Sequence, residues 1–197
     1  EAFQIMAAVY PNFALAKNVL ETNFENLNLL WHPAIALLNV AHFDREKARG
    51  EKTALFYQTG ITEHTGLLTE AQDREREPLY RAYGVPYHSL RELTRQYVKG
   101  TGKTMAEAQR NSNFIKDSPA FSVDQWARWI QWDMPLAVVP MILLADLAGV
   151  SMPLHRGLVD IFGALLETDF WKTGLTLERL GLGGLSVSEV LRYVTEG

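Results

Sequence analysis

The sequence contains no cysteine among its 197 residues, which excludes disulfide frameworks, thiolate catalysis and cysteine-ligated zinc. Basic residues are also in the minority, since 19 Lys and Arg stand against 23 Asp and Glu, a formal net charge of −4. A protein that binds nucleic acid normally presents a basic face to the phosphates, so we expect no nucleic-acid partner. The absence of cysteine is compatible with a reducing cytoplasm, where we expect the protein to act.

Long hydrophobic runs are scarce as well. The most apolar stretch, 134–145, is shorter than the ~20 residues that cross a bilayer. No basic residue precedes an apolar run at the N-terminus, as a secretory signal would require. We therefore expect a buried core helix at 134–145 and no membrane partner. Hydrophobic residues make up 47% of the chain, and this length suits one domain with a sizeable core.

From residue 13 onward the hydrophobic pattern is helical. Apolar residues recur at spacings of three and four over residues 13–42, which predicts a first long helix interrupted at Pro33. Further helices are expected at 62–83, 123–132, 135–148 and 154–167. Capping boxes predict short helices after Ser89, Thr104 and Ser186. Residues 3–10 and 52–57 resemble strands or extended segments, so the predicted fold is all-α or nearly so.

Nucleotide and metal motifs are missing. No G-x-G-x-x-G follows a strand, and the one phosphate-loop-like run, 102–104, has Tyr97 where the motif needs its first glycine. The sequence therefore carries no nucleotide-binding motif of its own. The histidines other than His32 lie in polar or loop contexts without an i,i+4 partner, so no metal site is expected.

One face of the first helix is polar although the helix is otherwise apolar. At 100° per residue this stripe comprises Glu21, Glu25, Asn28, His32 and Asn39. Imidazole exchanges protons near neutral pH, so His32 is a candidate general acid or base. Pro33 removes an amide directly beside it and should kink the helix there. A buried histidine satisfied by its asparagine neighbours fits the same pattern.

A second candidate region surrounds three tryptophans. Trp126, Trp129 and Trp132 recur at spacing three and predict an aromatic ridge in the core. Asp133 precedes Met-Pro, the position of an N-cap, and a carboxylate held there could also orient an imidazole. Arg128 lies in the same apolar run and needs an anionic partner, either a carboxylate of this chain or one of a ligand.

Several of these residues occur in a recognisable order. The sequence resembles the helical C-terminal domain of octopine/nopaline-type opine dehydrogenases, most specifically where Asn28 precedes the run His32–Asn39. The resemblance spans nearly the whole chain and continues through Phe56–Tyr57, Asp73–Arg76, Arg128 with Asp133, and Leu177–Leu182. It implies a multi-helix bundle resembling the C-terminal domain of 6-phosphogluconate-dehydrogenase-like enzymes. Residues 95–122 match the family least well.

The resemblance also implies an activity. Enzymes of this family condense an amino acid with a 2-oxo acid to an imine and reduce it with NADH or NADPH. By position, His32 would be the general acid/base at the carbonyl or imine, and Asp133 would hold its tautomer. Arg128 would bind a substrate carboxylate, with Asn28 as a neighbour in the site.

The family also has a Rossmann half that holds NAD or NADP, and this sequence lacks a counterpart. We therefore expect the chain to be one domain of a longer enzyme, inactive alone. Residues 1–10 would be the tail of, or the connection from, the missing Rossmann domain, and residues 11–197 the helical substrate and catalytic domain. An exposed apolar patch would fit either a homodimer or the face that the missing domain covers, and periodicity alone does not distinguish the two.

Two other functions fit the pattern of residues. A different NAD-dependent dehydrogenase, such as a hydroxyacid or ketopantoate-type reductase, would use a lysine in its helical domain, and the stripe around His32 has none. A non-catalytic helical module that dimerises or binds peptides would bury His32 and expose a large apolar face. The resemblance favours the opine dehydrogenase.

Overall fold

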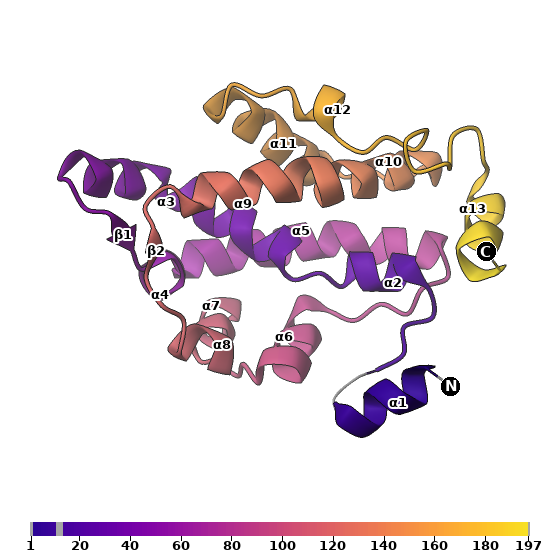
Figure 1. Ribbon diagram of the computed structural model, residues 1–197, viewed down its shortest axis with the longest axis horizontal. Helices are drawn as coiled ribbons and strands as arrows, with labels where there is room; N and C mark the ends of the chain where they lie inside the picture. The colour runs from indigo at the N-terminus through magenta and orange to yellow at the C-terminus, as the bar shows by residue number, and fades with distance from the viewer. Residues whose placement is uncertain (1, 11–13, 197) are drawn as a thin grey trace.

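The computed structural model describes residues 2–10 and 14–196 and is built almost entirely of helices (Figure 1). Its helices are α1 (Ala2–Val9), α2 (Val19–Phe24), α3 (Asn28–Ala48), α4 (Phe56–Gly60), α5 (Glu63–Ala82), α6 (Leu90–Val98), α7 (Met105–Arg110), α8 (Asn113–Lys116), α9 (Gln125–Asp133), the π-helix η1 (Met134–Val138), α10 (Val139–Leu147), α11 (Pro153–Leu165), α12 (Phe170–Thr173) and α13 (Val187–Glu196). Within the described ranges, one antiparallel pair of two-residue strands, β1 (Thr53–Ala54) and β2 (Phe121–Ser122), completes the fold. The predicted all-α class is confirmed.

The long helices form the centre of the molecule. α3 packs against both α5 and α9, while α9, η1 and α10 follow one another and run as one rod above α5 in Figure 1. α6 and α7 cover α5 from below, and α11 and α12 lie above the rod. This arrangement places the first half of α3 against the end of α9.

Local capping fixes the ends of several helices as the sequence predicts. The Thr62 hydroxyl accepts from the amide of Thr65, and the Thr65 hydroxyl accepts from the amide of Thr62, which begins α5. Gly84 follows α5 with φ +57, the left-handed conformation that glycine adopts at helix ends. The predicted capping boxes at Ser89 and Thr104 are confirmed, and Ser186 exchanges the expected bonds with Glu189.

Both predicted extended segments are largely wrong. Residues 3–9 belong to helix α1, because this segment is rich in the helix formers Ala, Met and Gln. None of the residues of α1 is buried. Of residues 52–57, only Thr53–Ala54 forms a strand, and helix α4 begins at Phe56. The role of residues 1–10 as a connection from another domain stays a prediction.

The predicted first helix breaks at a different place. It divides into α2 and α3 between Phe24 and Asn28, and Pro33 lies inside α3. Two polar groups explain the break, since Arg76 donates to the Phe24 carbonyl at the end of α2 and the Asn26 side chain accepts from the amide of Asn28.

The helices predicted at 123–132 and 135–148 are continuous. Asp133 is in the αR conformation and its side chain makes no capping bond, so its predicted N-cap role is wrong. Pro135 and Pro140 lack the amides that a regular helix needs, and the chain adopts a π-turn at η1 instead of stopping. The joined helix Gln125–Leu147 is long and apolar enough to span a membrane by length and composition alone, but 56% of its most apolar window is buried in the protein, as in a core helix.

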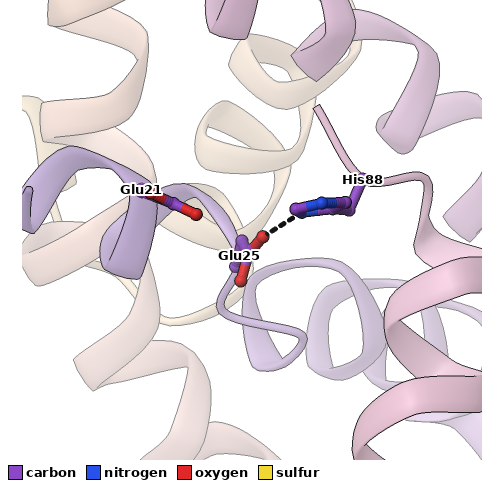
Figure 2. A group of neighbouring side chains, drawn as sticks. All are labelled: Glu21, Glu25 and His88. Carbon is purple, nitrogen blue, oxygen red and sulfur yellow. Dashed lines mark hydrogen bonds and ion pairs between the residues drawn. The ribbon is translucent and has the colours of Figure 1, made fainter. Parts of the chain in front are cut away.

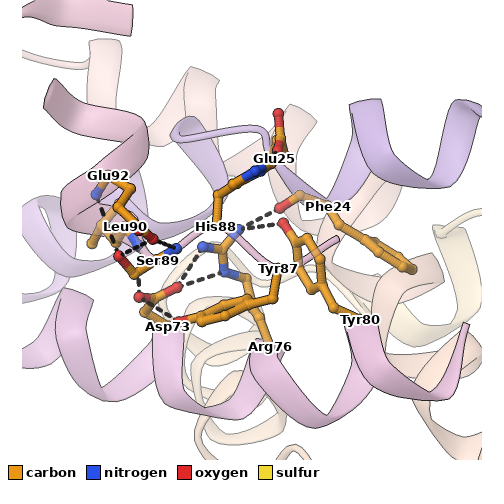
Figure 3. Close-up of polar contacts among 10 residues, drawn as sticks. All are labelled: Phe24, Glu25, Asp73, Arg76, Tyr80, Tyr87, His88, Ser89, Leu90 and Glu92. Atoms are coloured by element: carbon orange, nitrogen blue, oxygen red, sulfur yellow. Dashed lines mark hydrogen bonds and ion pairs between the residues drawn. The ribbon is translucent and has the colours of Figure 1, made fainter. Parts of the chain in front are cut away.

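A buried cation connects α2, α5 and α6 (Figure 3). The Arg76 side chain is 0% exposed and donates to Asp73, to the Phe24 carbonyl and to the Tyr80 hydroxyl. The second oxygen of Asp73 accepts from the Leu90 amide at 2.8 Å and from the hydroxyl of Tyr87 at 3.0 Å. Four of the five N–H donors of Arg76 and both oxygens of Asp73 are thereby used. A buried ion pair is tolerated when further hydrogen bonds satisfy its polar groups in this way.

Arg76→Met should destabilise the fold by about 3–5 kcal/mol, because it leaves the Asp73 carboxylate buried without its cation. The free energy of unfolding from urea denaturation measures this loss. Arg74→Met is the matched control, since Arg74 lies two residues away on the exposed side of α5, and it should change the stability by less than about 0.5 kcal/mol. Equal stabilities of the two variants would contradict the assignment.

A second buried pair attaches α11 to α5. Glu75 accepts from the Leu154 amide at 2.7 Å, and its other oxygen accepts from the amide of His155 at 3.1 Å and from Nδ1 at 2.8 Å. Burial lowers the pKa of His155 below its ordinary value of 6.5, and Glu75 offsets this only in part. Its Nε2 is buried without a partner, so a proton there would find no acceptor. Burial opposes ionisation of Glu75, but the three hydrogen bonds outweigh it and lower the pKa of Glu75.

The free energy of unfolding should therefore fall as the pH drops from 7.5 to 4. A buried histidine with a lowered pKa takes up its proton later than the unfolded chain does, and so does a carboxylate with a lowered pKa. Each excess proton in the unfolded state costs about 1.4 kcal/mol per pH unit, beginning near pH 6.5 for His155. Urea denaturation across this range measures the slope, and His155→Gln should flatten it between pH 6.5 and 5. An unchanged slope in that variant would overturn the interpretation.

Candidate active site

His32 lies in the first half of α3 with both ring nitrogens hydrogen-bonded. Nδ1 is 2.7 Å from Oδ2 of Asp133, the last residue of α9, and Nε2 is 2.8 Å from the hydroxyl of Tyr57 on α4. Three helices therefore meet at one imidazole. The structure brings together His32 and Asp133, which are 101 positions apart in the sequence.

The partners assign the tautomer of this imidazole. A carboxylate only accepts hydrogen bonds, so Nδ1 of His32 carries the proton and donates it to Asp133. In the neutral ring Nε2 then has a free lone pair, and the Tyr57 hydroxyl donates to it. Burial raises the pKa of Tyr57, and the charge of Asp133 raises it further, so the phenol keeps its proton. The result is an ordered chain of hydrogen bonds from Tyr57 through His32 to Asp133.

Aromatic rings enclose the imidazole. Trp129 stacks on it with 4.5 Å between ring centroids and 7° between planes, and Phe56 approaches edge-on at 6.0 Å. His32 is only 4% exposed, whereas the side chain of Asp133 is 17% exposed. The pair is thus shielded from water on most sides, which strengthens its electrostatic interactions.

The predicted tryptophan ridge is core only in part. Trp126 is buried, Trp129 stacks on His32, and Trp132 is 68% exposed. The three rings diverge because steps of 300° advance the side chains progressively around the helix. Trp132 therefore faces a surface hollow of about 410 Å³ together with Gln131 and Leu136.

Among the described residues, no hydrogen bond or ion pair joins Arg128 or Asn28 to the His32–Asp133 pair. Arg128 is exposed on α9, five residues before Asp133 and therefore about 140° around the helix from it. Among the described residues, its side chain forms no hydrogen bond or ion pair. Because Arg128 is exposed, water can solvate its guanidinium, and the expected need for an anionic partner does not hold. Asn28 is exposed at the start of α3, one turn before His32. Their roles in substrate binding stay predictions.

The rest of the predicted polar stripe is directed elsewhere. Asn39 donates to the carbonyls of Ile35 at 2.8 Å and Gly60 at 3.0 Å, which docks α4 on α3. Glu21 lies in α2, Glu25 directly follows this helix, and both lie beside His88 (Figure 2). The residues of the predicted stripe therefore lie in separate places: His32 beside Asp133, Asn39 beside Gly60, and the two glutamates beside His88.

Glu21, Glu25 and His88 form the one group in the described part of the chain whose ligand atoms could hold a metal ion, all within 4.8 Å of one another. Sequence spacing did not indicate it, since His88 lies more than 60 residues from both glutamates. Its groups already have protein partners: Glu25 accepts from His88 at 2.5 Å and from the hydroxyl of Tyr97 at 2.6 Å, and Glu21 accepts from the Lys17 amide at 2.5 Å. Burial and the bond to Glu25 raise the pKa of Tyr97 to about 12.

Tyr57 is the site residue that the sequence pattern missed. Its segment has the pattern of a strand, and such a pattern does not indicate a contact with His32, which lies 25 residues away. The signal that could have found it is its place in Phe56–Tyr57, one of the short runs that carry the family resemblance.

Comparison with known proteins defines the class of this helical domain. The family model described as "NAD/NADP octopine/nopaline dehydrogenase, alpha-helical domain" matches residues 15–166. The chain therefore belongs to this family. The opine dehydrogenase of Arthrobacter sp. (strain 1C) is 29% identical over 194 residues, which cover 96% of this chain and 51% of that protein. The chain spans about half the length of this curated relative.

The described residues do not fit a dinucleotide by themselves. Dinucleotides of this kind bind at the carboxyl ends of parallel strands, where a glycine-rich turn meets a helix. The part of the chain that the structure describes offers only the antiparallel pair β1 and β2. NAD or NADP, which the family uses, would have to be held mainly by other residues.

Proposed function

We propose that this chain is the substrate-binding and catalytic domain of an opine dehydrogenase, which condenses an amino acid with a 2-oxo acid. His32 is the general acid/base at the carbonyl or imine centre, and Asp133 holds its tautomer and stabilises the imidazolium. The observation that supports this assignment is the 2.7 Å bond between the two side chains, which come from distant helices of a domain in this family.

The condensation needs a group that carries protons over a short distance. The amine nitrogen attacks the carbonyl carbon, the carbonyl oxygen leaves as water, and both hydrogens of that water come from the amine. His32 can do this through the Tyr57 hydroxyl that is bonded to Nε2, while Nδ1 stays bonded to Asp133. The hydroxyl takes a proton from the nitrogen as it gives its own to Nε2, and the reverse transfer delivers a proton to the oxygen. The dinucleotide of the family supplies the hydride that reduces the imine when it is bound.

This function requires a second domain. We propose that a Rossmann domain holding NAD or NADP accompanies this chain in the enzyme, and that the exposed Arg128 binds a substrate carboxylate at the face that closes on it. Hydride transfer needs the reacting atoms about 3–3.5 Å apart. The helical domain alone should therefore be inactive.

Oxidation of NADH and NADPH by the enzyme that carries both domains, with pyruvate and a panel of amino acids, tests the proposal. His32→Asn should lower kcat/KM by about 100- to 10,000-fold, the usual contribution of general acid–base catalysis, with dinucleotide binding unchanged. His42→Asn is the matched control, since His42 lies on the same helix and its ring packs against that of Phe43.

Two outcomes would contradict the proposal. Turnover that needs no amine would make the enzyme a 2-oxo acid reductase. Full activity of His32→Asn would make His32 a structural core histidine.

Arg128→Lys should raise the KM of one carboxylate substrate by about 10- to 100-fold. Lysine keeps the charge but loses the bidentate geometry, and a hydrogen bond to a charged group contributes roughly 1.5–3 kcal/mol. Steady-state kinetics with each substrate varied in turn measures the effect, with Arg74→Lys as the control. Unchanged KM values for both substrates would remove Arg128 from the site.

A further inference from the structure

Tyr57 occupies the ring nitrogen of His32 through which protons would move. We propose that Tyr57 positions His32 and relays its protons: its hydroxyl holds Nε2 while Asp133 holds Nδ1, so the imidazole is fixed at both ends in one tautomer and exchanges protons through the hydroxyl. The inference rests on the proposed function for its kinetic consequence, but the geometry is independent of it. The two bonds measure 2.8 Å and 2.7 Å.

The position of Tyr57 is determined by how α4 docks on α3. Gly60 ends α4 so close to α3 that a Cβ atom there would lie 2.7 Å from Cγ2 of Ile35. The Gly60 carbonyl also accepts from the Asn39 side chain at 3.0 Å. This close approach brings the first turn of α4, and with it the Tyr57 hydroxyl, opposite His32.

The ring of Tyr57 is itself held by other aromatic rings. Its centroid lies 5.4 Å from Phe114, 5.9 Å from Phe121 and 5.8 Å from Trp129. Tyr57 is 2% exposed. A swing of its hydroxyl away from Nε2 would break these contacts and leave two polar atoms buried without partners, which costs free energy.

A phenol suits a histidine that alternates between base and acid. The hydroxyl donates to Nε2 of the neutral ring, and after protonation its oxygen accepts from Nε2–H. Burial, and then the charge of Asp133, raise the pKa of Tyr57, so it stays a phenol in both states. Phenylalanine keeps the ring but offers neither bond.

Tyr57→Phe should lower kcat by about 10- to 100-fold in the two-domain enzyme, because small displacements of a catalytic group cost about this much. The KM values of both substrates and the dinucleotide affinity should stay within about twofold. Tyr83→Phe is the matched control, because Tyr83 is also a buried tyrosine. Its hydroxyl donates to the Leu144 carbonyl at 2.9 Å and not to His32.

A spectroscopic measurement separates this inference from the proposed function. In the chain labelled with ¹⁵N-histidine, the Nε2 resonance of His32 should show a hydrogen-bonded acceptor nitrogen in the wild type and in Tyr83→Phe. It should move to the position of a free acceptor nitrogen in Tyr57→Phe. This readout needs no turnover, and the wild-type spectrum alone decides the hydrogen bond should Tyr57→Phe fail to fold.

The outcomes are distinguishable. Unchanged kcat and an unchanged Nε2 resonance in Tyr57→Phe would overturn the positioning role, even if His32→Asn abolishes turnover. A faster Tyr57→Phe enzyme would also overturn it, because the hydroxyl would then obstruct the site. If His32→Asn stays active, the proposed function fails, and a shifted Nε2 resonance would still support the hydrogen bond.

Discussion

The buried guanidinium of Arg76 joins segments that otherwise share little contact. Desolvating a cation costs several kcal/mol, and this cost is offset only when hydrogen bonds of good geometry satisfy its donors. Here the partners are the Asp73 carboxylate, the Tyr80 hydroxyl and the last carbonyl of α2, while Asp73 in turn holds the first amide of α6. Because only a short link separates α2 from α3, the hydrogen bonds of Arg76 also determine where α3 begins. The position of His32 therefore depends on an ion pair that takes no part in its chemistry.

Much of the fold could be predicted from local sequence. The capping residues Ser89 and Thr104 satisfy amides within three residues of themselves, so their signals do not depend on tertiary structure. The errors arise where groups far apart in the sequence determine the ends of a helix. The break before α3 is made by Arg76, which donates to a carbonyl 52 positions away, and the joining of α9 to α10 depends on a π-turn rather than on any local stop signal. Propensity around Pro33 could not reveal either interaction.

The candidate site shows the same division. The residue types of His32 and Asp133, together with their order in the family resemblance, were enough to pair them, and the structure brings their side chains within hydrogen-bonding distance. Periodicity alone was misleading about Glu21 and Glu25, because the helix that would align them with His32 is interrupted. Tyr57 was missed since its contact with His32 exists only through the docking of α4 at Gly60. Exposed Arg128 keeps its predicted role as a proposal for substrate binding.

The π-turn η1 changes the direction in which the side chains of α10 point, relative to those of α9. The Val139 amide bonds the Met134 carbonyl, so this turn holds one residue more than an α-helix would, and everything after it is rotated by about 100°. As a result α9 can aim the Asp133 carboxylate at α3, while α10 turns an apolar surface inward in the same core. In a regular helix one rotation about the helix axis would have to satisfy both the direction of Asp133 and the burial of the apolar face of α10. The orientation of Asp133 relative to α10 thus depends on the one extra residue that this turn contains.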